Sequence, residues 1–172
     1  MKSDLKFNIV EFPKEPEDDF LDSIFDLNQL NTPEVGSLDS IEYLKYLLTI
    51  ASKNFFVLLD NEIIGFIVCF REGSSYSSLN YKFFSKNETK FLYIDRVVIK
   101  DTFRRKGIGL NLYQYIESIA MEKNIPLCCE VNTKPLNKVS IDFHTNFGFK
   151  EIGNYDLETG SVAYFRKNTD IN

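Results

Sequence analysis

A basic turn with two glycines precedes a helical pattern in the second half of the chain. The segment FRRKGIGLNLY, residues 103–113, places three cations directly before Gly107 and Gly109. A helix N-terminus leaves backbone N–H groups unpaired and carries a partial positive charge, so it attracts anions. Because glycine lacks a Cβ atom, a phosphate can approach the backbone closely there. The residue types and their spacing therefore predict a phosphate-binding turn.

Two other kinds of phosphate loop do not fit this segment. A Walker A loop needs Lys and Ser or Thr after its last glycine, where this chain has Leu110 and Asn111. The dinucleotide-binding fingerprint needs a third glycine where this chain has Leu112. The remaining alternative is that the glycines only ease the turn from a strand into a helix.

Three titratable side chains are candidates for proton transfer or substrate binding. His144 is the only histidine, and its reference pKa of about 6.5 suits a proton donor, although a lone histidine is also a common packing or surface residue. Asp95 lies in the apolar segment FLYIDRVVI, where burying a carboxylate is costly unless it has an ionic partner or a catalytic function. It is the candidate base, and a buried ion pair is the alternative. Glu130, at the end of LCCEVN, is predicted to orient a substrate.

The elements that must position these residues predict an α/β fold with a mixed sheet flanked by helices. A first strand precedes a pair of helices, and strands and helices then alternate in one domain over residues 1–172. The predicted strands cover residues 5–12, 54–60, 62–71, 91–100, 127–132, 149–155 and 161–167, and the predicted helices cover residues 18–31, 37–53, 108–124 and 137–146.

A polar stretch rich in aromatic residues, residues 72–90, is predicted to be a long loop. Loops of this length in compact domains are often functional lids or binding loops. Tyr76, Tyr81 and Phe84 are therefore candidates for an aromatic wall of a substrate site. The alternative is that these side chains pack the loop down.

Composition excludes several classes of function. The net charge of −5 over 172 residues argues against a broad nucleic-acid surface. The cysteines Cys69, Cys128 and Cys129 are odd in number, so we expect no disulfide framework. Cys128 and Cys129 lie in an apolar run and are expected to be strand residues rather than nucleophiles. One histidine without a C-x-x-C pair leaves a metal site without ligands. No apolar run is long enough for a signal peptide or a membrane span, so we expect a cytoplasmic protein.

Two segments together resemble the signatures of a known family. R-x-x-G-x-G after an apolar strand is similar to the pyrophosphate loop of the GNAT superfamily of acyl-CoA-dependent N-acyltransferases, and NKVSIDFHTNFGF resembles its second signature. The segments YIDRVVI, CEVN and PLNKVSIDFH also resemble a subgroup of predicted acetyltransferases whose substrate is unassigned. The resemblance covers nearly the whole chain.

The resemblance implies an enzyme that transfers an acetyl group directly from acetyl-CoA to a primary amine, on a small molecule or a peptide. A domain that binds acyl-CoA without turnover is the alternative, and a homodimer is left open. In the family a tyrosine usually protonates the departing thiolate of the cofactor, and His144 occupies the position of that tyrosine in this chain. Asp101 replaces a proline that is common before the pyrophosphate loop of the family. The residues that the resemblance assigns to the cofactor are Val97, Val98 and Ile99 by their backbone, together with Arg104, Arg105, Lys106, Gly107, Ile108, Gly109 and Asn137.

Overall fold

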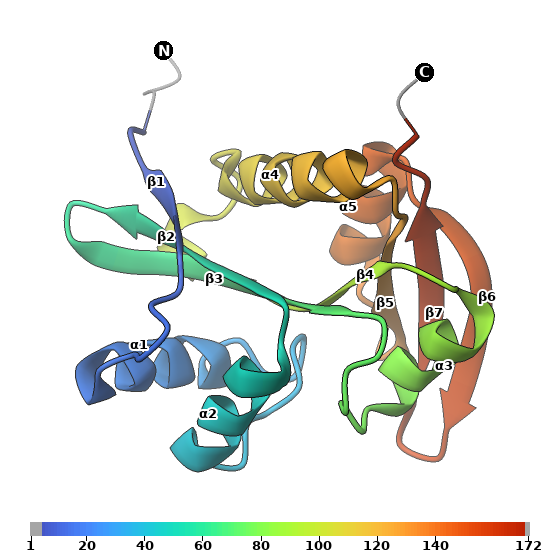
Figure 1. Ribbon diagram of the computed structural model, residues 1–172, viewed down its shortest axis with the longest axis horizontal. Coiled ribbons are helices and arrows are strands. Elements are labelled where there is room, and N and C mark those ends of the chain that lie inside the picture. The colour runs from blue at the N-terminus through green and yellow to red at the C-terminus, as the bar shows by residue number, and fades with distance from the viewer. Residues whose placement is uncertain (1–4, 171–172) are drawn as a thin grey trace. The chain divides into compact units, whose positions relative to one another are not determined.

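The structure, a computed structural model that describes residues 5–170, contains one seven-stranded sheet in the order β1-β2-β3-β4-β5-β7-β6 (Figure 1). The strands are β1 (Asn8–Glu11), β2 (Lys53–Leu59), β3 (Glu62–Arg71), β4 (Leu92–Ile99), β5 (Leu127–Lys134), β6 (Lys150–Leu157) and β7 (Gly160–Lys167). The helices are α1 (Asp18–Gln29), α2 (Ile41–Ile50), α3 (Leu79–Asn87), α4 (Ile108–Lys123) and α5 (Lys138–Phe147).

The sheet is mixed, as the sequence predicts. Strand β4 pairs with β5 in parallel, whereas β1–β2, β2–β3, β5–β7 and β6–β7 pair antiparallel. The predicted helix pair after the first strand is confirmed as α1 and α2. The β2–β3 hairpin turns at Asp60 and Asn61, whose φ angles of 47° and 65° are those of a primed turn that matches the twist of the strands.

The prediction of a structureless loop over residues 72–90 is wrong, because this segment contains α3. The Ser78 side chain accepts a hydrogen bond from the Tyr81 backbone N–H and caps the helix. Tyr81 and Phe84 lie three residues apart and are both buried, so the helix has one apolar face despite its polar composition.

The chain divides into two compact units, and β3, β4 and α4 contribute residues to both. The first unit comprises the described residues up to Cys69 together with Arg96–Tyr115. In this unit α1 and α2 lie side by side on one side of the β2–β3 hairpin (Figure 1). Their apolar faces bury Leu21, Ile24, Leu44 and Leu47, none more than 1% exposed.

The second unit comprises Phe70–Asp95 and the described residues from Ile116 on, and its core is rich in aromatic rings. The ring of Phe70 stacks on Tyr76 with a centroid distance of 4.3 Å, and Phe83 stacks on Tyr164 at 3.9 Å. Tyr81 packs against Tyr93 edge-on at 5.6 Å. The high aromatic content of the chain is therefore largely core, where such pairs stabilise packing.

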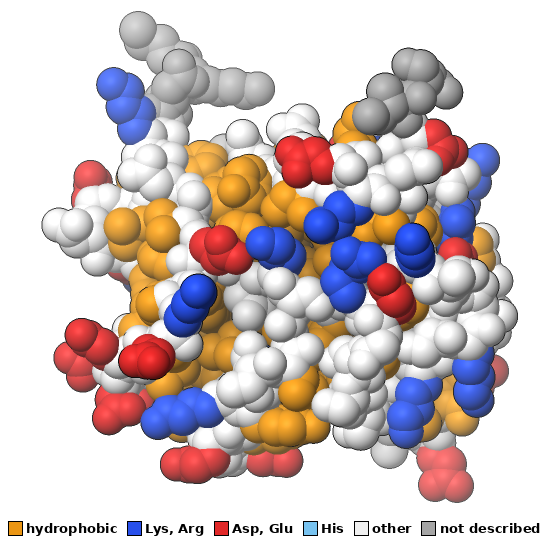
Figure 2. All heavy atoms as spheres, in the orientation of Figure 1, with side chains coloured by type: hydrophobic (Ala, Val, Ile, Leu, Met, Phe, Trp, Pro, Cys, Tyr) orange, Lys and Arg blue, Asp and Glu red, His pale blue; other side chains and the backbone are white. Residues whose placement is uncertain are grey.

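The face drawn in Figure 2 shows acidic side chains among the basic and hydrophobic ones. Within residues 5–170, no helix is both long and apolar enough to cross a membrane. Cys69, Cys128 and Cys129 are buried, and none of them forms a disulfide within residues 5–170. Burial raises the pKa of Cys128 and Cys129, which keeps both as thiols rather than nucleophilic thiolates.

Candidate active site

The predicted phosphate loop lies in the first unit, between the end of β4 and the start of α4. Gly107 has a φ of +83°, and Arg105 has a φ of 60°, so both occupy the left-handed region. A Cβ atom added at Gly107 would meet only the Asn111 amide nitrogen, at 3.8 Å. Helix α4 begins at the next residue, Ile108. The loop thus leaves open space above the N-terminus of a helix, the arrangement that phosphate groups favour.

The three cations of the loop have different surroundings. The Arg104 guanidinium donates to the Ile99 carbonyl oxygen at 3.2 Å and pairs with Asp101 at 3.0 Å, so it is held within the unit. Arg105 is exposed and makes no ion pair or hydrogen bond within residues 5–170. Lys106 is also exposed, and its ammonium lies 5.1 Å from the centre of the Phe103 ring. Arg105 and Lys106 are therefore the cations best placed to contact an external phosphate.

Two asparagines near the C-terminal end of α1 hold arginines of the phosphate-loop region. Arg104 donates a hydrogen bond to the Asn31 side-chain oxygen. Arg96, which is buried, donates to the Asn28 side-chain oxygen at 2.9 Å and to the Gly36 carbonyl at 3.2 Å. This link could not be predicted from the sequence, since the partners lie more than 60 residues apart and the helical pattern of α1 gives no sign of it.

The strand residues assigned to the cofactor by resemblance alternate in burial. Val98 is 2% exposed, whereas Val97 and Ile99 are half-buried and share a face with Asp95. On the neighbouring strand β3, a Cβ atom at Gly65 would lie 2.7 Å from the Val98 carbonyl oxygen. Gly65 therefore allows β3 to approach the segment of β4 whose backbone is proposed to receive the cofactor.

In the second unit, Glu130 lies at the centre of a hydrogen-bonded cluster. The Tyr93 hydroxyl donates to one carboxylate oxygen at 2.7 Å, and the Asn80 amide donates to the other at 3.2 Å. The Tyr164 hydroxyl donates to the Asn80 oxygen at 3.1 Å. Burial, and then the negative charge of Asp95, raise the pKa of Glu130 to about 8. A half-buried carboxyl with such a pKa exchanges a proton near neutral pH.

Asp95, the base expected from the sequence, also lies in the second unit. One of its carboxylate oxygens accepts a hydrogen bond from the Tyr76 hydroxyl at 2.8 Å. The structure brings Asp95 close enough to Glu130 for their charges to interact. Because two nearby carboxylates disfavour double ionisation, Asp95 helps Glu130 to hold a proton.

His144, the expected proton donor, is buried in α5. Its Nδ1 atom lies 2.7 Å from the Ser140 carbonyl oxygen, which can only accept, so Nδ1 carries a proton. Burial lowers the pKa of His144, and the bond to Ser140 opposes this only in part. The neutral ring therefore has no proton on Nε2, and a general-acid role requires the imidazolium that burial disfavours. That role stays a prediction, and these surroundings favour the packing alternative.

The remaining predicted site residues take part in local structure. Asn137 caps α5 by accepting a hydrogen bond from the Ser140 backbone N–H at 3.1 Å. Tyr81 and Phe84, predicted as a substrate wall, are 2% and 0% exposed, so packing is their role in this structure. Tyr76 is 8% exposed and orients Asp95. Within residues 5–170, no group of three or more His, Cys, Asp or Glu side chains could hold a metal ion.

Comparison with protein families decides the affiliation of the chain. The model of the acetyltransferase (GNAT) family matches residues 21–149, which include the phosphate loop, Asp95, Glu130 and His144. The chain belongs to the GNAT acetyltransferase family. None of the curated proteins compared with the chain matches it.

Solved structures confirm the GNAT fold over nearly the full length. The ribosomal-protein-S18-alanine N-acetyltransferase from Escherichia coli is 13% identical with a TM-score of 0.68, and the match covers 97% of this chain and 96% of that one. Arabidopsis thaliana Naa50 in complex with the bisubstrate analogue CoA-Ac-MVNAL is 18% identical with a TM-score of 0.68, covering 94% and 98%. An N-acetyltransferase from Staphylococcus aureus is 19% identical with a TM-score of 0.67, covering 95% and 99%.

Proposed function

We propose that this GNAT protein is an N-acetyltransferase that transfers the acetyl group of acetyl-CoA directly to a primary amine. The observation that carries the proposal is the phosphate loop, where Gly107 leaves open space at the start of α4 and Arg105 and Lys106 are exposed beside it. These residues fit a pyrophosphate by charge and by the absence of a side chain at the point of approach. Family membership supports acetyl-CoA as the donor.

Glu130 is the group that we propose to take the proton from the acceptor amine. The neutral amine nitrogen forms a bond to the thioester carbonyl carbon, the carbon–sulfur bond breaks, and the amine proton passes to the Glu130 carboxylate. The leaving thiolate has a conjugate acid of pKa about 8.5, like that of a cysteine, so it departs without needing a strong acid. The hydrogen bonds from Tyr93 and Asn80 hold the carboxylate in one orientation.

The pKa of Glu130 favours an α-amine as the acceptor. An α-ammonium group has a pKa of about 8, close to the value of about 8 for Glu130. Near pH 8 a large share of the α-amine is therefore already neutral while Glu130 is ionised and able to take the proton released on attack, whereas a lysine ammonium, with a pKa of about 10.4, stays almost fully protonated there. We therefore propose free amino acids or peptide N-termini as the substrate class. Two structural neighbours were solved with peptide-derived ligands, the NatC complex with Gag peptide and Naa50 with its bisubstrate analogue.

A binding and turnover experiment tests this function. Acetyl-CoA should raise the melting temperature of the wild type, because it binds only the folded state. Gly107→Val should abolish this rise, since a β-branched residue is strained at a φ of +83° and fills the open space. Free thiol should then appear when a panel of α-amines is added to the wild type. Protection by acetyl-CoA without thiol release from any amine would instead indicate a silent acyl-CoA-binding domain.

A further inference from the structure

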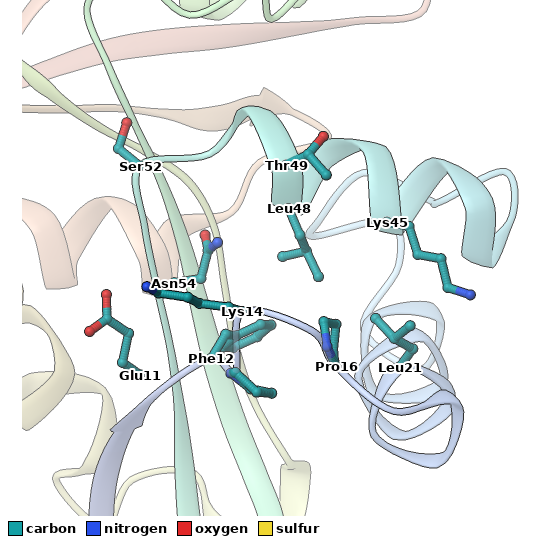
Figure 3. Close-up of a pocket in the computed structure, with 11 residues that line it drawn as sticks. Glu11, Phe12, Lys14, Pro16, Leu21, Lys45, Leu48, Thr49, Ser52 and Asn54 are labelled. Atoms are coloured by element: carbon teal, nitrogen blue, oxygen red, sulfur yellow. The ribbon is translucent and has the colours of Figure 1, made fainter.

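A pocket in the first unit is lined by none of the residues assigned to catalysis. It is formed where β1 ends, by the linker into α1, by α2 and by the start of β2 (Figure 3). Its volume is about 480 Å³, within the range of small-molecule sites in proteins. The phosphate loop, Glu130, Asp95 and His144 contribute nothing to its lining. We call it the β1–α1 pocket; its lining residues are Glu11, Phe12, Pro13, Lys14, Pro16, Leu21, Lys45, Leu48, Thr49, Ser52 and Asn54.

The apolar part of the β1–α1 pocket is fixed by packing. The Phe12 ring lies edge-on to Phe20 at 5.1 Å and to Phe56 at 5.9 Å. Leu21 is fully buried in α1, and Leu48 projects from α2 (Figure 3). Because these side chains are held by their neighbours, the apolar surface exists before any ligand arrives, which lowers the entropic cost of binding.

A buried polar atom in the same pocket lacks a partner. The side-chain oxygen of Asn54 is inaccessible to solvent and accepts no hydrogen bond within the described residues. Leaving a buried acceptor unsatisfied costs about 1–3 kcal/mol, so such groups usually serve a bound molecule or water. A half-turn of the amide exchanges its oxygen and nitrogen, so Asn54 can offer its acceptor to a donor within the pocket.

The charges around the β1–α1 pocket leave one cation unpaired. Lys45 pairs with Asp18 at 3.2 Å, and Lys53 pairs with Glu11 at 3.2 Å. Lys14 has no ion pair within residues 5–170, and its side chain extends toward Asn54 in Figure 3. Among the lining residues Glu11, Lys14 and Lys45 are charged, and their charges sum to +1, which favours an anionic ligand.

We propose that the β1–α1 pocket binds a small carboxylic acid that has an apolar group and one N–H donor. The carboxylate pairs with Lys14, the N–H donates to the Asn54 oxygen, and the apolar group lies on Phe12 and Leu48. This site does not depend on the proposed transferase activity, because the ligand needs no primary amine and contacts none of the catalytic candidates.

Three matched probes test which features of the proposed ligand the pocket recognises. N-acetyl-L-phenylalanine has all three features, its neutral C-terminal amide lacks the anion, and 3-phenylpropionate lacks the N–H donor. We expect saturable shifts of backbone amide NMR signals in residues 12–16 and 45–54 with the complete probe. The other two probes should bind at least about tenfold more weakly, the loss expected for one charge-assisted or buried hydrogen bond.

Variants of the full chain locate the binding. Lys14→Met and Asn54→Leu should each weaken binding of N-acetyl-L-phenylalanine about tenfold, while Lys82→Met, an exposed lysine of α3, should have no effect. Asn54→Leu should keep the melting temperature, because it removes an unsatisfied buried acceptor. Lys14 is exposed, so its variant serves as the test if Asn54→Leu does not fold. Absence of saturable shifts, shifts confined to other residues, or unchanged affinity in Lys14→Met would overturn the proposal.

Discussion

At the scale of single residues, the chemistry that we propose depends on Glu130. Glu130→Gln keeps the shape of the side chain but removes the proton acceptor. Turnover should fall by roughly 10²- to 10⁴-fold, the range for a positioned general base. Below about pH 8, wild-type turnover should fall more steeply than that of the variant, because the wild type needs both Glu130 and the acceptor α-amine to lose a proton whereas the variant needs only the amine to do so. Turnover measured from pH 6 to 9 decides this, with the exposed Glu151→Gln as the control.

The same carboxyl has a predictable effect on stability. Its folded-state pKa of about 8 lies above the ordinary value of 4.5, so the folded state holds a proton that the unfolded state releases. This contribution to stability is complete below pH 4.5 and is lost as the pH rises to about 8. Glu130→Gln should therefore show a smaller decline of melting temperature between these pH values. An identical decline in both proteins would show that Glu130 titrates normally.

Two variants of His144 distinguish a catalytic role of this residue from a packing role. His144→Phe should lower the melting temperature, because it removes the ring's hydrogen bond to the Ser140 carbonyl. Turnover per folded molecule should change less than about tenfold, since the neutral ring has no proton to give from Nε2. A loss of about 100-fold or more, restored by His144→Tyr, would assign His144 as the general acid that the family resemblance implies. Melting curves and turnover of both variants distinguish these outcomes.

At the scale of elements, α1 supports the phosphate loop through Asn31. In Asn31→Ala, Arg104 loses one partner, and the loop becomes less preorganised for phosphate. We expect acetyl-CoA affinity to fall about tenfold, in line with the loss of a hydrogen bond to a charged group. Titration calorimetry measures this, with Asp22→Ala on the exposed face of α1 as the control. Equal affinities in all three proteins would mean that α1 plays no part in cofactor binding.

The close approach of β3 to β4 gives a second prediction at this scale. Gly65→Ala places a Cβ atom 2.7 Å from the Val98 carbonyl oxygen, a backbone atom that cannot swing aside. The strain should destabilise the fold by about 1–3 kcal/mol, as overpacking does. Gly36→Ala, where a Cβ atom meets nothing within 4 Å, should stay within about 0.5 kcal/mol of the wild type. Urea unfolding compares them, and equal midpoints would refute the close approach.

Most elements could be predicted from local patterns, but α3 could not. The other helices have either a longer apolar pattern in the sequence or a recognisable end, such as Gly148 after α5, whereas α3 has nine residues and only Tyr81 and Phe84 buried. Its cap, Ser78, stands among several serines, so the start signal is not distinctive. Patterns of two buried residues in nine do not separate a short helix from a loop whose aromatic side chains pack down.

At the scale of the whole molecule, sequence motifs predicted the family but not the cluster around Glu130. The partners Asn80, Tyr93 and Tyr164 come from three separate elements, and only tertiary structure shows that they meet. The same holds for Arg96 and Asn28, which are 68 residues apart. In contrast, the cations and glycines of the phosphate loop lie within six residues, so a joint role for them can be predicted from the sequence alone.

The central claim is direct transfer of the acetyl group from acetyl-CoA to an α-amine. The most direct test compares the amount of acetylated peptide formed with the amount of CoA thiol released. Wild-type protein should be mixed with acetyl-CoA and a lysine-free peptide that has a free N-terminus, and the products followed by mass spectrometry. We predict one acetylated peptide for each CoA thiol released, no acetylated form of the protein, and no product from the same peptide with a blocked N-terminus. Acetylated protein that passes its acetyl group to the peptide, or thiol release without any acetylated amine, would contradict the account.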